Sequence, residues 1–271
     1  MNMHSPNSTR FTQPKLNGVL VRSRLLDTLL DRKDKKVILV HGRAGQGKST
    51  LVAHFLQLGN LDSLWFNLSK DDYDHLLLLG RIQEGLKPLK GQQPPTYQDD
   101  ALSQSLRQFL LVLEKNFTND VYLVLDDFQQ VNHFATVREL MNRLIDILPE
   151  TIHLVIVSRT YPQLSLSRTI AERQLVEIDD MDLAFTKEEI RDFFASLYAL
   201  KLNSIELEEI FDISVGWITA LVHLAESLDT KPETLQKQIL HTFVSEKQLP
   251  SLRSFFEEEV FNGLSPESVS G

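Results

Sequence analysis

The most constraining feature of this chain is an apolar run that leads into a glycine-rich turn near its start. Val37–Val40 precedes Gly42-Arg43-Ala44-Gly45-Gln46-Gly47-Lys48-Ser49-Thr50, which fits the pattern G-x-x-x-x-G-K-[S/T] and continues into a helical pattern. Successive backbone N–H groups in such a turn, together with the N-terminus of the following helix, converge on an anion. The pattern therefore predicts a strand, a phosphate-binding loop and a helix within an α/β sheet.

The residue types in this turn suit a nucleoside triphosphate. Glycines let the backbone approach the phosphates. Lys48 is expected to bridge the β- and γ-phosphates, and Ser49 to supply one oxygen to Mg²⁺. The predicted nucleotide-binding residues of the loop are Gly42, Ala44, Gly45, Gln46, Gly47, Lys48, Ser49 and Thr50. The alternative is a glycine-rich turn between strand and helix that binds nothing.

A second apolar run, Val121–Leu125, ends in two acids, Asp126 and Asp127. In an open α/β sheet ligands lie at the carboxyl ends of the strands, where these acids are expected. Asp126 is predicted to hold Mg²⁺ through a water, and Asp127 to orient or deprotonate the attacking water. Alternatively, both acids only cap the helix that follows.

A third apolar run, Ile152–Ser158, is followed by Arg159. A guanidinium group matches the geometry of a phosphate, so Arg159 is predicted to sense the γ-phosphate and to act in hydrolysis with Lys48 and Asp127. The alternative is an arginine exposed at the end of a strand.

The remaining patterns indicate the fold class. Ser63–Leu68 and Gln174–Ile178 add two strands, and helical patterns separate the strands, which predicts a parallel P-loop sheet flanked by helices. From Leu183 onward only helical patterns occur, and Thr186–Glu189 has the form of a capping box. A small all-helical domain is therefore expected after the sheet.

Composition limits the partners. The 271 residues carry a formal net charge of -9, which gives the whole chain no electrostatic reason to bind nucleic acid. They include no cysteine, which excludes disulfides, thiolate metal sites and a cysteine nucleophile. Six basic residues form the densest basic cluster, which is interpreted as a solvated helix face near the nucleotide cleft: Arg22, Arg24, Arg32, Lys33, Lys35 and Lys36. The apolar runs are too short to span a bilayer, so no membrane partner and a cytoplasmic location are expected.

Taken in order, these motifs resemble the STAND class of P-loop ATPases and, within it, the MalT-like branch of LuxR-type bacterial transcription activators. The resemblance rests on Val21–Leu26, Gly42–Thr50, Leu123–Phe128, Val157–Arg159, Gln174–Ile178, Leu183–Thr186 and the Gly-Trp-x-x-Ala-Leu segment Gly216–Leu221. No Asn-Lys-x-Asp segment of the guanine-specific kind occurs, so adenine is the favoured base.

The resemblance implies further assignments. ADP would hold a resting state, and ATP would produce an active state that self-associates in the full-length protein. Leu20, Val21 and Arg22 would contact the adenine side. Gly216 and Trp217 stand where other STAND proteins carry a Gly-x-Pro nucleotide contact, although packing of Trp217 in the core is the alternative.

The expected domains are a lead-in segment and helix over 1–35, a nucleotide-binding domain over 36–184, a helical domain over 185–243 and the start of a truncated winged-helix domain over 244–271. The chain is thus expected to be a fragment of a regulator that binds ATP or ADP with Mg²⁺, hydrolyses ATP slowly and does not itself bind DNA. Two alternatives stay open: a fast P-loop ATPase such as a motor or kinase, and an interaction module in which the nucleotide is a structural plug.

Overall fold

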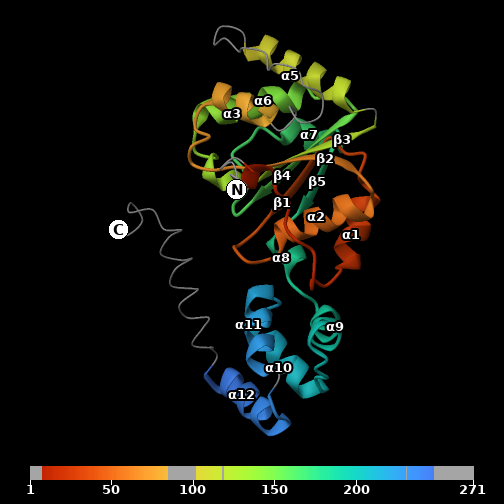
Figure 1. Ribbon diagram of the computed structural model, residues 1–271, viewed down its shortest axis with the longest axis vertical. Coiled ribbons are helices and arrows are strands. Elements are labelled where there is room, and N and C mark those ends of the chain that lie inside the picture. The colour runs from red at the N-terminus through yellow and green to blue at the C-terminus, as the bar shows by residue number, and fades with distance from the viewer. Residues whose placement is uncertain (1–7, 85–101, 118, 230, 247–271) are drawn as a thin grey trace, which may run out of the picture. The chain divides into compact units, whose positions relative to one another are not determined.

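A computed structural model describes residues 8–84, 102–117, 119–229 and 231–246 (Figure 1). The chain forms two compact units. The first comprises Met1–Leu16, Ser23–Arg43 and Lys48–Asp182, and the second comprises Asn17–Arg22, Ala44–Gly47 and Leu183–Gly271. The expected winged-helix segment lies outside the described residues from position 247 onward.

The first unit contains a parallel five-stranded sheet, as the apolar runs predict. Its strands, in spatial order, are β2 (Asp62–Asn67), β3 (Val121–Asp126), β4 (Ile152–Ser158), β1 (Val37–His41) and β5 (Leu175–Ile178). Because β1, β3 and β4 are neighbours or next neighbours, their carboxyl ends lie along one edge of the sheet. This edge is where the sequence predicts the phosphate loop, the acid pair and Arg159.

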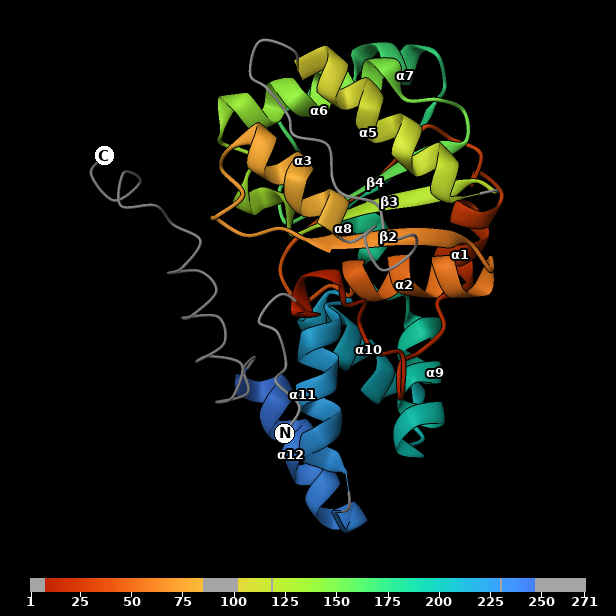
Figure 2. The same cartoon turned by 45° about the horizontal axis from the view of Figure 1, so that its top comes forward.

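Helices cover both faces of the sheet. Helices α3 (His75–Glu84), α5 (Leu102–Asn116) and α6 (Ala135–Ile147) lie on one face, and α1 (Ser23–Leu30) and α2 (Lys48–Leu58) lie on the other (Figures 1 and 2). The short helices α7 (Ser167–Ala171) and α8 (Asp180–Leu183) flank β5 in the chain. The apolar residues of α3, α5 and α6 share one core with alternate residues of the strands, including Leu123 and Leu154.

The expected lead-in segment contains a short helical turn. A 3₁₀ turn, η1 (Ser8–Phe11), packs on the edge strand β2, and the rings of Phe11 and Phe66 have centroids 5.4 Å apart. Gln13 Nε2 donates to Ser63 Oγ at 3.1 Å, close to the start of the same strand. The N-terminal segment thus covers a sheet edge whose polar groups are otherwise available for pairing.

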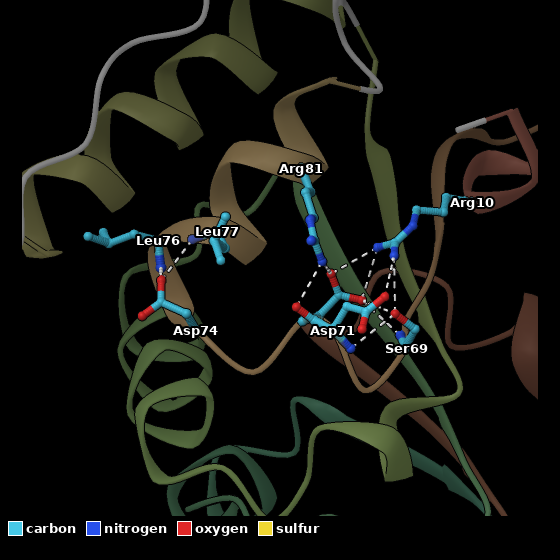
Figure 3. Close-up of polar contacts among 8 residues, drawn as sticks. Arg10, Ser69, Asp71, Asp74, Leu76, Leu77 and Arg81 are labelled. Atoms are coloured by element: carbon cyan, nitrogen blue, oxygen red, sulfur yellow. Dashed lines mark hydrogen bonds and ion pairs between the residues drawn. The ribbon is translucent and has the colours of Figure 1, made fainter. Parts of the chain in front are cut away.

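A buried carboxylate anchors this segment. Asp72, in the loop after β2, is fully buried and accepts hydrogen bonds from Arg10 Nη1 at 3.0 and 3.2 Å and from the Arg81 guanidinium. Figure 3 shows Arg10 and Arg81 approaching the loop that carries Ser69 and Asp71. Helix α3 therefore begins only at His75, because Asp72 serves the loop and Asp74 caps the helix.

The second unit is helical, with α9 (Lys187–Tyr198), α10 (Ser204–Ser214), α11 (Ile218–Leu228) and α12 (Glu233–Glu246). The predicted capping box is present: Glu189 N donates to Thr186 Oγ1 at 3.2 Å, and Thr186 N donates to Glu189 Oε2 at 3.0 Å. In the Gly-Trp-x-x-Ala-Leu segment the helix begins only at Ile218, because Gly216 has a positive φ of 71° and Trp217 is extended.

The interpretation of the basic cluster as one solvated face is wrong for Arg22. Its side chain is 7% exposed, donates to the carbonyls of Leu183 and Ala184 and pairs with Glu189 at 3.0 Å. A guanidinium group offers five donors, so one arginine can hold several acceptors of the second unit at once.

Candidate functional site

The predicted phosphate loop connects the end of β1 to the first residue of α2, which is Lys48. Gly42, Gly45 and Gly47 have φ values of 152°, 68° and 77°. Residues with a Cβ rarely adopt such values, so the turn requires glycine at these three positions. Ser49 and Thr50 follow in the first turn of α2. The backbone N–H groups of a first turn have no acceptor within the helix and therefore favour an anion.

Lys48 lies folded against the start of the loop. Its Nζ donates hydrogen bonds of 2.6 Å to the carbonyl oxygens of both Gly42 and Arg43, and the residue is 8% exposed. Burial, and next the positive charge of Arg159, lower the pKa of Lys48 to about 8. An anion beside this ammonium group would offset both effects.

Ser49 and Asp126, the two predicted Mg²⁺ ligands, lie side by side. Ser49 Oγ donates to Asp126 Oδ1 at 3.0 Å, and Asp127 N donates to the same oxygen at 2.9 Å. Burial raises the pKa of Asp126 to about 6, although the hydrogen bond from Ser49 acts in the opposite direction. A hydroxyl and a carboxylate fit Mg²⁺, which takes oxygen ligands and commonly combines one or two protein groups with waters and phosphates.

Asp127 has a left-handed backbone, with φ 59° and ψ 38°. Its side chain makes no capping bond to η3 (Phe128–Gln130), all of which is described, and it accepts instead from Gln129 Nε2 at 2.8 Å. The capping alternative is therefore not supported for Asp127. A non-glycine residue in this conformation is uncommon, and such residues concentrate at functional sites.

Gln129 is a site residue that sequence reasoning missed. Besides donating to Asp127, its Oε1 accepts from Arg159 N at 2.9 Å. One side-chain amide thus connects the acid after β3 to the arginine after β4. The available signal was an amide two residues after the acid pair, because the side chain of Asn or Gln offers a donor and an acceptor on separate atoms of one neutral group.

Arg159 is exposed at the carboxyl end of β4, and its charge acts on the Lys48 ammonium group. The structure therefore brings Lys48, Ser49, Asp126, Asp127 and Arg159 to one edge of the sheet, in the first unit.

The middle of the loop, Ala44–Gly47, belongs to the second unit, where it contacts the start of α11. Trp217 Nε1 donates to Ala44 O at 3.0 Å, and Thr219 Oγ1 donates to Gly45 O at 2.7 Å. Trp217 is also 9% exposed within the helical core, so the packing alternative holds. Thr219 carried no sequence signal.

The remaining residues predicted to contact the nucleotide lie in the second unit and differ in burial. Leu20 packs partly buried against the helical core, whereas Val21 is 50% exposed. A Cβ at Gly216 would collide with the backbone of Phe185, whose N donates to Gly216 O at 2.8 Å, so close packing explains this glycine. Contacts of Leu20, Val21, Arg22, Gly216 and Trp217 with a nucleotide stay predictions.

Residues 31–166, half of the chain, match the family described as AAA domain. The chain belongs to the AAA domain family. This family places the chain among the P-loop ATPases, in agreement with its sheet and its loop.

Curated relatives of this AAA domain chain are bacterial transcriptional regulators. The HTH-type transcriptional regulator MalT of Klebsiella pneumoniae is 29% identical over 219 residues, covering 79% of this chain and 24% of the relative. MalT of Serratia proteamaculans is 29% identical over 220 residues with the same coverage. The chain thus spans about a quarter of the length of these relatives, and the resemblance to MalT-like proteins inferred from the motifs is confirmed.

Solved structures share the fold. A STAND protein with a tetratricopeptide repeat sensor from Pyrococcus horikoshii aligns with a TM-score of 0.62 at 14% identity, covering 85% of this chain and 33% of that one. A Walker-type ATPase from Pyrococcus abyssi aligns with a TM-score of 0.50 at 13% identity, covering 93% and 79%. Among the described residues, no helix has the length and apolarity needed to cross a membrane.

Proposed function

We propose that this AAA domain chain binds ATP and ADP with Mg²⁺, hydrolyses ATP slowly and is the nucleotide switch of a MalT-like transcriptional regulator. The observation that carries the proposal is the convergence of Ser49, Asp126 and Lys48 with the Asp127–Gln129–Arg159 chain at one edge of the sheet. The kinship with transcriptional regulators supports the regulatory part.

The chain's own residues would divide the work between binding and chemistry. Lys48 would exchange its two carbonyl acceptors for phosphate oxygens, whose negative charge would raise the pKa of its ammonium group. Ser49 and Asp126 would hold Mg²⁺, which would neutralise charge that develops on the phosphates.

Asp127 would orient the attacking water and accept its proton, because its carboxylate is held by the neutral amide of Gln129. Gln129 would keep this carboxylate and the backbone of Arg159 at a fixed separation. Arg159 would stabilise negative charge on the γ-phosphate, since a guanidinium group matches phosphate oxygens.

The rate of turnover tests the switch against a fast enzyme. A regulatory nucleotide switch is expected to hydrolyse ATP at about 10⁻⁴ to 10⁻² s⁻¹. The measurement is phosphate release from the purified chain in excess MgATP, with Lys48→Ala as the blank. A rate above about 1 s⁻¹, in the ordinary range of enzymes, would favour the motor or kinase alternative.

We also propose that the ADP state is the resting state and that ATP promotes self-association of the full-length regulator. Light scattering of the full-length protein with ADP and with ATP, in the presence of its inducer, tests this. Equal molar mass in the two nucleotides would contradict it.

A further inference from the structure

Two side chains at the start of α11 hold two consecutive peptide groups of the phosphate loop. The acceptors are the carbonyl oxygens of Ala44 and Gly45, and the donors are Trp217 Nε1 at 3.0 Å and Thr219 Oγ1 at 2.7 Å. All four residues belong to the second unit. Side-chain donors to adjacent carbonyls of a tight turn fix the planes of both peptides.

The orientation of these planes decides where the loop's N–H groups point. In a trans peptide the C=O and the N–H of the same plane point in opposite directions, and the described chain has no cis peptide bond. With the Ala44 carbonyl directed at Trp217, the N–H of Gly45 is directed away from it. With the Gly45 carbonyl directed at Thr219, the N–H of Gln46 is likewise directed away.

Both donors are themselves held in place. Trp217 is 9% exposed in the helical core with Leu221 and Leu224, so its indole N–H has a fixed direction. Thr219 lies in the first turn of α11. Gly45 has a φ of 68°, and a Cβ added there would overlap the Thr219 side chain. The approach of Thr219 thus depends on glycine at this position.

We propose that Trp217 and Thr219 are positioning residues for nucleotide binding, which turn the N–H groups of Gly45 and Gln46 toward the phosphates. The inference rests on the proposed function and deepens it, because it has Trp217 act on the phosphates through the loop and not by direct contact with the nucleotide. Such preorganisation lowers the cost of ordering the loop when phosphate binds.

Two conservative variants of the 271-residue chain test the proposal. Trp217→Phe keeps an aromatic ring but removes the N–H donor, and Thr219→Val keeps the shape but removes the hydroxyl. Ser227→Ala is the matched control, since it removes a hydroxyl of the same helix whose bond, to His223 O at 2.7 Å, stays inside α11. Affinities for MgATP and for Mg-tripolyphosphate, which has no base or ribose, are measured by displacement of a fluorescent ADP analogue.

Each conservative variant is expected to weaken both ligands by the same factor, about three- to tenfold, which is the range for one lost hydrogen bond. Ser227→Ala is expected to change neither. A loss for MgATP alone would place Trp217 on the nucleoside and overturn the proposal. Unchanged affinities for both ligands would overturn it as well. So would a failure of Mg-tripolyphosphate, at millimolar concentration, to displace the fluorescent ADP analogue from the wild type.

The design separates this inference from the proposed function. If the wild type binds MgATP and Lys48→Ala binds it roughly ten- to a hundredfold more weakly, the nucleotide site stands whatever the α11 variants do. Thermal unfolding without ligand shows whether Trp217→Phe is folded, and Thr219→Val, which leaves the core intact, decides the outcome if it is not.

Discussion

Ser49 Oγ and Asp126 Oδ1 are 3.0 Å apart although the residues are separated by 77 positions in the chain. The carboxylate is 6% exposed, and its burial raises its pKa to about 6. In the absence of a cation, the chain therefore keeps a costly negative charge in place. A cation bound beside Asp126 would stabilise this charge.

We predict that Asp126→Asn stabilises the nucleotide-free chain at neutral pH. The folded pKa of about 6 lies above the reference value of 3.8, so the folded state holds a proton between these values that the unfolded state has lost. Stability of the wild type relative to the variant therefore falls as pH rises from about 4 to about 6. Above that window the variant should be more stable by up to about 3 kcal/mol.

Urea unfolding at pH 4, 5, 6 and 7.5 measures this difference. The amide oxygen of the variant can still accept from Ser49 and from Asp127 N. Asp31→Asn, at an exposed carboxylate, is the control and is expected to change stability little. A variant that is less stable than the wild type at pH 7.5 would contradict the prediction.

Lys48→Ala should weaken binding of MgATP by roughly ten- to a hundredfold, because it removes a charge-assisted contact to the phosphates. In the wild type the affinity for MgATP should also decline as pH rises through about 8, which is the pKa of Lys48 without nucleotide, because the charged form of Lys48 binds phosphate. Titration calorimetry measures both effects, with Lys70→Ala as an exposed lysine control. Unchanged affinity in Lys48→Ala would remove the basis for the phosphate loop.

Asp127→Ala should keep ATP bound while hydrolysis falls by roughly 10²–10⁴-fold, because Asp127 is proposed to act on the attacking water. Single-turnover hydrolysis with bound ATP separates the two steps. An unaffected rate would reduce Asp127 to a structural residue of the turn.

Gln129→Ala should lower the single-turnover rate with little loss of ATP affinity, because the hydrogen bonds of the Gln129 side chain join Asp127 to the backbone of Arg159. Gln130→Ala, at the neighbouring amide, is the control. Equal rates in Gln129→Ala and the wild type would mean that the bridge from Asp127 to Arg159 is not needed for chemistry.

Asp72→Ala should destabilise the chain by roughly 3 kcal/mol, because it leaves Arg10 and Arg81 without their shared buried carboxylate. The measurement is the free energy of unfolding in urea, compared with Asp71→Ala, whose side chain is 76% exposed. A loss no larger than that of Asp71→Ala would show that the N-terminal segment is not anchored through Asp72.

The local elements of this protein were predictable because neighbouring residues determine them. Apolar runs identified the strands, Gly42–Ser49 identified the loop, and Thr186 with Glu189 identified the start of α9. Periodicity and turn chemistry act over a few residues, so the sequence alone carries them. The convergence of the loop, the acid pair and Arg159 also followed, because the carboxyl ends of parallel strands share one edge.

Only the tertiary structure revealed which side chains hold these groups in place. Gln129 reaches Arg159 over 30 positions, Arg10 reaches Asp72 over 62, and Trp217 reaches Ala44 over 173. Each bond depends on how separate elements pack, and a glutamine, an arginine or a tryptophan has the same local preferences whether or not such a partner exists. The local sequence pattern therefore does not indicate these contacts. They are determined by the way in which helices and strands pack.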